Sequence, residues 1–204
     1  MIIRTEFPCA TAHEDVRIPM PDGVELYARI WRPVTDGPVP ALLEYVPDRL
    51  TDSTAPRDRQ RHPWYAGHGY ASVRVDVRGH GCSGGRPGDE YGAREPADGV
   101  AVVEWLAAQP WCTGSVGMFG IERGGSDSLR IAALAPEALK AVVTVCSTDD
   151  RFDNDAHYCG GSVLAVDLHA RSAAMLASAA RPPDPLYAGD GWRAQWLDRL
   201  EGLE

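Results

Sequence analysis

Four short apolar runs constrain the fold of this chain most strongly. Each is rich in valine and bounded by glycine or proline, and together they cover residues 39–46, 70–77, 115–119 and 141–146. Runs of this length and composition are typical of strands buried in a parallel sheet. Helical spacing at 98–109 and 124–135 separates the later runs, and a proline follows each of these segments. Alternating strands and helices predict an α/β fold with crossover connections.

The two ends of the chain differ from this central pattern. Residues 16–18 and 24–31 alternate in character around Pro21-Asp22-Gly23, which predicts an antiparallel hairpin. Residues 162–203 have a helical pattern that prolines interrupt at 182–185. We therefore expect residues 1–160 to form the core of the domain and residues 161–204 to begin a helical cap.

Composition excludes several classes of protein. The 204 residues carry a formal net charge of −9, which argues against nucleic-acid and acidic-membrane partners. No stretch approaches the roughly 20 apolar residues that a membrane-spanning helix needs, and we expect no signal peptide at residues 1–6. The five cysteines are scattered and form no CxxC pair. We expect reduced thiols in a cytoplasmic protein without a metal site or other cofactor.

The most informative short segment follows the third apolar run. Residues 120–125 are Gly-Ile-Glu-Arg-Gly-Gly and lead directly into the second predicted helix. A strand, a tight turn and a helix form the nucleophile elbow of many hydrolases, in which small residues flank a strained central residue. Gly120 and Gly124 have the right places for this turn, but the central residue is Glu122 instead of a serine.

Five segments of the sequence carry a resemblance to one enzyme family. They extend over most of the chain and comprise 20–26 (MPDGVEL), 69–71 (GYA), 76–85 (DVRGHGCSGG), 104–118 (EWLAAQPWCTGSVGM) and 155–161 (DAHYCGG). In these segments the chain is similar to the X-Pro dipeptidyl-peptidases and cocaine esterase-like (CocE/NonD) hydrolases. The resemblance implies an α/β-hydrolase fold with a mostly parallel sheet and an N-terminal hairpin. It also implies ancestral hydrolysis of acyl esters, amides or X-Pro peptides, with a small molecule or peptide as substrate.

The resemblance also implies that the catalytic positions have changed. The family's nucleophile is the serine of Gly-x-Ser-Tyr-x-Gly, and Glu122 and Arg123 occupy the places of its Ser-Tyr pair. A tyrosine of the family's oxyanion hole corresponds to Asp48. The family's catalytic Asp and His lie beyond its helical cap, whereas this sequence ends within the predicted cap. We expect Glu122 and Asp48 at the catalytic positions, and Arg123 and Tyr45 as ligand-contacting residues.

Three functions remain open on these residues. The first is a truncated, degenerate hydrolase, a pseudoenzyme without serine-hydrolase activity, whose incomplete sheet a homo- or hetero-oligomeric partner would cover. The second is an enzyme that uses the carboxylates of Glu122 and Asp48 as nucleophile, base or acid. The third is a non-catalytic module that binds a cationic ligand or a paralogous hydrolase. The first accounts for all the altered positions together, and we favour it.

Overall fold

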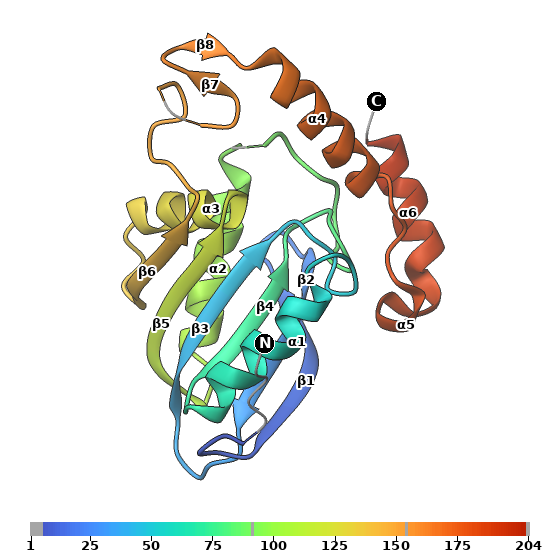
Figure 1. Cartoon of the computed structure of the whole chain (residues 1–204). Helices are drawn as coiled ribbons and strands as arrows, with labels where there is room; N and C mark the ends of the chain where they lie inside the picture. Colours follow the sequence, from blue (N-terminus) through green and yellow to red (C-terminus); the bar gives the residue numbers. More distant parts are fainter. Residues whose placement is uncertain (1–5, 91, 154, 203–204) are drawn as a thin grey trace.

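The computed structural model describes residues 6–90, 92–153 and 155–202. Most of residues 1–6, where we expect no signal peptide, and the end of the predicted cap segment lie outside this part. A six-stranded sheet forms the centre, with strand order β1-β2-β4-β3-β5-β6 (Figure 1). The strands are β1 Thr11–Pro19, β2 Glu25–Pro33, β3 Val39–Val46, β4 Ala71–Asp76, β5 Cys112–Ile121 and β6 Leu139–Val145.

Strand direction confirms the predicted α/β architecture. β1 and β2 form the antiparallel hairpin, and β2 also pairs antiparallel with β4. The four strands from β4 to β6 in the sheet order are parallel, so their carboxyl ends meet at one edge of the sheet. α2 (Arg94–Ala107) and α3 (Arg123–Ala133) lie on one face, and α1 (Ala55–Gly67) lies on the other (Figure 1).

The apolar core lies between the sheet and α2 and α3. Leu43, Val73 and Met118 from the strands are buried there, as are Val102 and Leu106 from α2. Burial of each such side chain stabilises the fold by about 1.5–3 kcal/mol. The helical spacing found in the sequence therefore marks the face of α2 that packs on the sheet.

The apolar pattern does not predict α1, because polar contacts hold this helix. The Nε of Arg74 in β4 donates to Asp58 Oδ2 at 2.9 Å. The ring of His62 lies 2.7 Å from Ser72 Oγ and 3.0 Å from Glu44 Oε2. All of these side chains are buried. A helix attached through a buried ionic network has no apolar stripe, so hydrophobic periodicity does not reveal it.

The expectation that all four apolar runs form buried strands is wrong for β6. Val143 is 63% exposed and Val145 is 50% exposed. β6 stands at the end of the strand order and pairs with β5 alone within the described part of the chain. The apolar run therefore forms an edge strand whose outer side is unpaired in the described part of the chain. Such edges tend to pair with strands of other protein chains.

The C-terminal segment is mostly helical, and its role as a cap stays a prediction. It comprises a short hairpin, β7 Tyr158–Cys159 with β8 Ser162–Val163, and then α4 Ala165–Ala179, α5 Pro185–Ala188, the 3-10 helix η1 Gly189–Gly191 and α6 Trp192–Glu201. α4 crosses above the carboxyl ends of the parallel strands (Figure 1). Arg199 Nη1 in α6 donates to the carbonyl of Gly81 at 2.9 Å, which attaches this segment to the loop after β4. No described helix is long and apolar enough to cross a membrane, and all five cysteines are free thiols.

Candidate functional site

The turn between β5 and α3 has the strained geometry of a nucleophile elbow. Glu122 is its central residue, with φ of +51° and ψ of −118°. Residues other than glycine rarely adopt this conformation, which costs about 1–3 kcal/mol. Surrounding hydrogen bonds hold it: Glu122 N donates to Val145 O at 2.9 Å, and Glu122 O accepts from Ser126 N at 2.9 Å and Ser147 Oγ at 3.0 Å.

Three glycines make this turn possible. A Cβ on Gly120 would lie 2.3 Å from the carbonyl carbon of Gly124, which is backbone and has little freedom to move. A Cβ on Gly124 would lie 2.8 Å from Val46 Cγ1, and one on Gly125 would lie 1.9 Å from Ser147 Oγ. The close packing of a nucleophile elbow is therefore retained around a residue that is not a serine.

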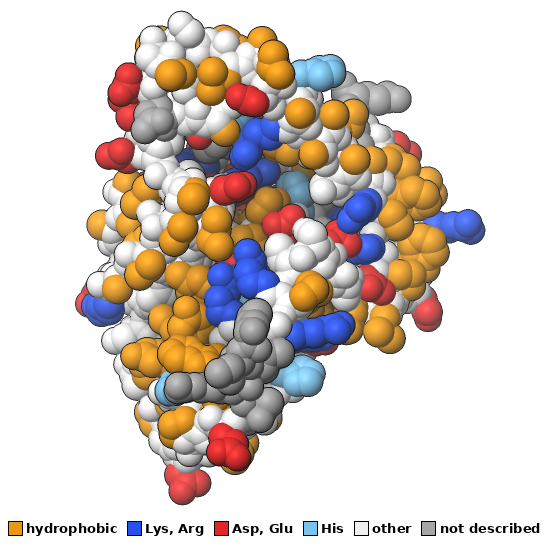
Figure 2. Space-filling view, in the orientation of Figure 1, with side chains coloured by type: hydrophobic (Ala, Val, Ile, Leu, Met, Phe, Trp, Pro, Cys, Tyr) orange, Lys and Arg blue, Asp and Glu red, His pale blue; other side chains and the backbone are white. Residues whose placement is uncertain are grey.

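The structure brings Glu122 and Asp48 to one cavity. It has a volume of about 750 Å³ and lies between the strand ends and α4. Acidic and basic side chains gather around the hollow on this face of the molecule (Figure 2). The side chain of Glu122 is exposed, whereas Asp48 in the loop after β3 is half-buried. Burial raises the pKa of Asp48, although the nearby Arg74 and Arg57 act in the opposite direction.

The other two predicted site residues differ in position. Arg123 lines the same cavity, and its Nη2 donates to Glu95 Oε1 at 2.8 Å. Tyr45 does not reach the cavity, because its side chain is 0% exposed in the core and its hydroxyl donates to the Glu95 carbonyl at 3.3 Å. Alternation along β3 turns Tyr45 toward the buried face of the sheet. The expectation that Tyr45 contacts a ligand is therefore not met.

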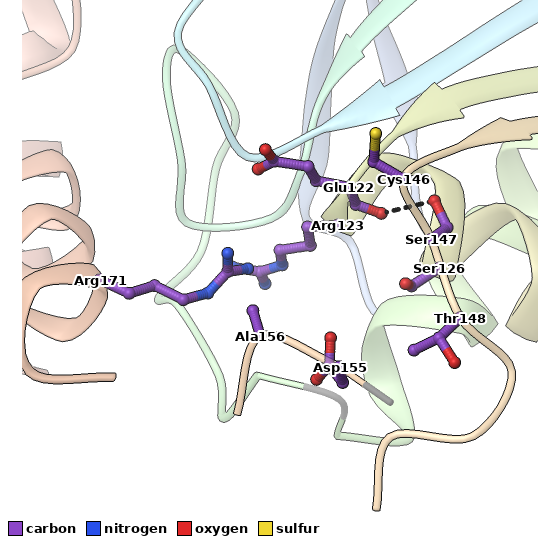
Figure 3. Close-up of a pocket in the computed structure, with 9 residues that line it drawn as sticks. All are labelled: Glu122, Arg123, Ser126, Cys146, Ser147, Thr148, Asp155, Ala156 and Arg171. Atoms are coloured by element: carbon purple, nitrogen blue, oxygen red, sulfur yellow. Dashed lines mark hydrogen bonds between the residues drawn. The ribbon is translucent and has the colours of Figure 1, made fainter. Parts of the chain in front are cut away.

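A second cavity of about 370 Å³ adjoins the elbow (Figure 3). Its lining includes Arg123 and Ser126 from α3, Ser147 after β6, Asp155, and Arg171 from α4. Sequence reasoning did not single out Arg171, since no spacing or motif places α4 over the elbow. Both cavities share Glu122, Arg123 and Arg171, so they adjoin each other.

Two histidines lie near this region, and each differs in its contacts from the base of a serine triad, which pairs Nδ1 with a carboxylate and turns Nε2 to the nucleophile. His157 Nδ1 lies 2.5 Å from Asp155 Oδ2, and its Nε2 lies 3.4 Å from Glu90 Oε2, so both ring nitrogens face carboxylates. His80 lines the larger cavity, and its Nδ1 lies 3.0 Å from the Arg78 carbonyl. Burial lowers the pKa of His80 to about 4, which makes it a weak base.

One group of metal-ligand type occurs among the described residues, beneath α1. Oxygen and nitrogen atoms of Glu44, Asp58 and His62 lie within 4.8 Å of one another. Arg57 Nη2 donates to Glu44 Oε1 at 3.0 Å, and Arg74 Nε donates to Asp58 Oδ2 at 2.9 Å. Guanidinium groups therefore occupy the carboxylate oxygens and would repel a cation. This arrangement suits a structural ionic network and not a metal site.

Comparison with known proteins identifies the relatives of this scaffold. The family model for X-Pro dipeptidyl-peptidase (S15 family) matches residues 22–202. Cocaine esterase from Rhodococcus sp. (strain MB1 Bresler) is 34% identical over 155 residues, which are 75% of this chain and 26% of the esterase. The chain therefore spans about a quarter of the length of that relative.

Solved structures agree with this relationship. A CocE/NonD family hydrolase from Staphylococcus aureus has a TM-score of 0.63 at 26% identity, covering 72% of this chain and 29% of the hydrolase. An α-amino acid ester hydrolase has a TM-score of 0.58 at 25% identity, covering 78% of this chain and 29% of that enzyme. The match over residues 22–202 and the similarity to solved structures lead to one conclusion: the chain belongs to the X-Pro dipeptidyl-peptidase (S15) family and has the α/β-hydrolase fold.

Proposed function

We propose that this chain keeps the scaffold and the pocket of a hydrolase but lacks serine-hydrolase activity. The observation that carries this proposal is the elbow, where a carboxylate takes the place from which a serine hydroxyl would attack. Glu122 lines the larger cavity together with Asp48. A substrate carbonyl bound there would meet hydrogen-bond acceptors where a hydrolase presents donors.

Electrostatics supports the loss of acyl transfer. The reaction develops negative charge on the carbonyl oxygen, which serine hydrolases stabilise with hydrogen-bond donors. An ionised carboxylate about 4 Å from this oxygen would oppose the charge by about 4 kcal/mol at an effective dielectric constant near 20. This energy corresponds to roughly a thousandfold loss in rate. The ring of His80 is only a weak base, and the Nε2 of His157, the nitrogen that would have to face a nucleophile, lies 3.4 Å from Glu90 Oε2.

A fluorophosphonate probe and p-nitrophenyl acetate test the proposal. We expect neither labelling nor hydrolysis above background for the wild-type protein. Glu122→Ser is expected to stay inert as well, because a serine at the elbow has no base to take its proton. Glu104→Ser, at an exposed position of α2, is the control. Labelling of the wild-type chain at a serine would overturn the proposal, and labelling of Glu122→Ser would show that a base is present.

A second candidate is an enzyme that uses its carboxylates. The different surroundings of Asp48 and Glu122 favour this candidate. Burial raises the pKa of Asp48, whereas the side chain of Glu122 is exposed. Carboxyl groups in unlike surroundings divide into acid and base roles in several enzymes. Glu122 would displace a leaving group from a saturated carbon and form an ester, which water then hydrolyses. Halide release from 1-chlorobutane that disappears in Glu122→Gln would support this chemistry, and no release from the wild type would exclude it.

A third candidate is a binding role without catalysis. Two carboxylates on one cavity wall suit a cationic ligand such as an alkylammonium ion. A thermal shift with millimolar butylammonium that Asp48→Asn abolishes would support it, whereas no shift would count against it. A partner chain on the outer edge of β6 stays a prediction, motivated by the exposed Val143 and Val145.

A further inference from the structure

The smaller cavity brings together two guanidinium groups from separate parts of the chain. Arg123 is the first residue of α3, and Arg171 lies in α4. Both line the cavity, and the ends of their side chains point toward each other (Figure 3). Two positive charges in this arrangement repel each other unless negative charge lies close to both.

The neighbouring carboxylates leave part of each guanidinium without an acceptor. Arg123 Nη2 donates to Glu95 Oε1 at 2.8 Å, whereas Arg171 Nη2 lies 3.4 Å from Glu90 Oε1. The Nε atoms of both arginines are buried and have no hydrogen-bond partner within the described part of the chain. A buried donor without an acceptor costs free energy, so the protein itself does not fully satisfy these two arginine side chains.

The rest of the cavity is compatible with an anion. Ser126 lines it with a buried side chain near the start of α3, and backbone N–H groups at a helix start favour negative charge. Asp155 also lines the cavity, but its Oδ2 lies 2.5 Å from His157 Nδ1. Figure 3 shows the carboxylate of Glu122 above the two guanidinium groups. Glu95, Glu90 and Asp127 also lie within 4.0 Å of the two guanidinium groups, so an anion would compete with these acids for the arginines.

The adjoining larger cavity indicates the class of ligand. It shares Arg123 and Arg171 and has an apolar wall, made of Val46, Ile121, Ala174, Met175 and Leu176 among others. The planar fork of a guanidinium matches the two oxygens of a carboxylate. We propose that Arg123 and Arg171 bind the carboxylate of a small organic acid whose apolar body lies along α4. This site does not depend on the chemistry of Glu122 or on the loss of serine-hydrolase activity.

Calorimetric titration with sodium hexanoate tests the proposal. Hexanamide is the control ligand, because it has the same apolar body without the charge. We expect hexanoate to bind at least tenfold more tightly than hexanamide, with an affinity that falls as salt rises. Arg171→Gln should weaken hexanoate binding by about ten- to hundredfold, the range of a charge-assisted hydrogen bond, and leave hexanamide unchanged. Arg193→Gln, exposed on α6, should change neither.

Several results would overturn the assignment. Equal binding of hexanoate and hexanamide would show that the arginine pair does not recognise the carboxylate, and so would equal effects of Arg171→Gln and Arg193→Gln. Inorganic phosphate that binds as tightly as hexanoate would contradict the role of the apolar wall. If Arg171→Gln does not fold, Arg123→Gln and the wild-type comparison of the two ligands decide the question. Fluorophosphonate labelling is a separate readout, so this site and the proposed function can fail independently.

Discussion

Replacing Glu122 with glycine tests whether the elbow still stores strain. The residue has φ of +51° and ψ of −118°, a conformation that costs about 1–3 kcal/mol for a residue with a Cβ. Glycine adopts this conformation without strain. Its greater conformational freedom in the unfolded chain offsets about 0.5–1 kcal/mol of the stability gained. The carboxylate is exposed, so little packing is lost. We expect Glu122→Gly to raise the free energy of unfolding by about 1 kcal/mol, the difference between these two ranges.

Urea denaturation followed by circular dichroism measures this change. For a chain of this size about 1 kcal/mol corresponds to roughly 2–4 °C in Tm, so a thermal melt gives a second readout. Glu104→Gly is the matched control, because Glu104 is exposed within the regular helix α2. There glycine should lower the free energy of unfolding by about 1 kcal/mol. Equal destabilisation by both substitutions would refute the argument that the elbow is strained.

Two further predictions concern buried charge and pH. Arg74 is 1% exposed and donates to Asp58 at 2.9 Å and Asp76 at 2.5 Å. Arg74→Met leaves both acids without their shared partner and should cost about 3–5 kcal/mol in urea denaturation, whereas a loss under about 1 kcal/mol would contradict the role of the network. Burial lowers the pKa of His80 from 6.5 to about 4, so the folded state binds fewer protons than the unfolded state between these values. The stability associated with neutral His80 is therefore lost as pH falls from 6.5 through 4. His80→Asn should flatten that part of the stability–pH profile, and an unchanged profile would count against a lowered pKa of His80.

Much of the fold follows from local rules that the sequence states directly. Valine-rich runs predict the parallel strands, and the bounds of β3, residues 39–46, agree with the prediction. The hairpin of β1 and β2 follows from alternation around a Pro-Asp-Gly turn. The apolar pattern did not predict α1, because the buried polar side chains of Asp58 and His62 attach this helix to the sheet. The apolar run alone predicted a buried strand for β6, whereas the expected incomplete sheet already implied an uncovered edge.

Part of the candidate site could also be predicted from the sequence. Gly120, Gly124 and Glu122 mark the elbow in the sequence, because a strained turn between strand and helix needs small neighbours and this need is local. Asp48 joins Glu122 because parallel strands end at the same edge of the sheet, a rule that sequence order is enough to apply.

Other features were decided only by the tertiary structure. The side chain of Tyr45 faces the core, and α4 brings Arg171 over the elbow to meet Arg123. The Nε2 of His157 also lies 3.4 Å from Oε2 of Glu90, a residue of a distant segment. These outcomes depend on how whole elements pack against one another, which no short stretch of residues encodes. The sequence by itself determined the scaffold and the changed residue at its centre, and the placement of the C-terminal helices over the strand ends decided which charges surround that residue.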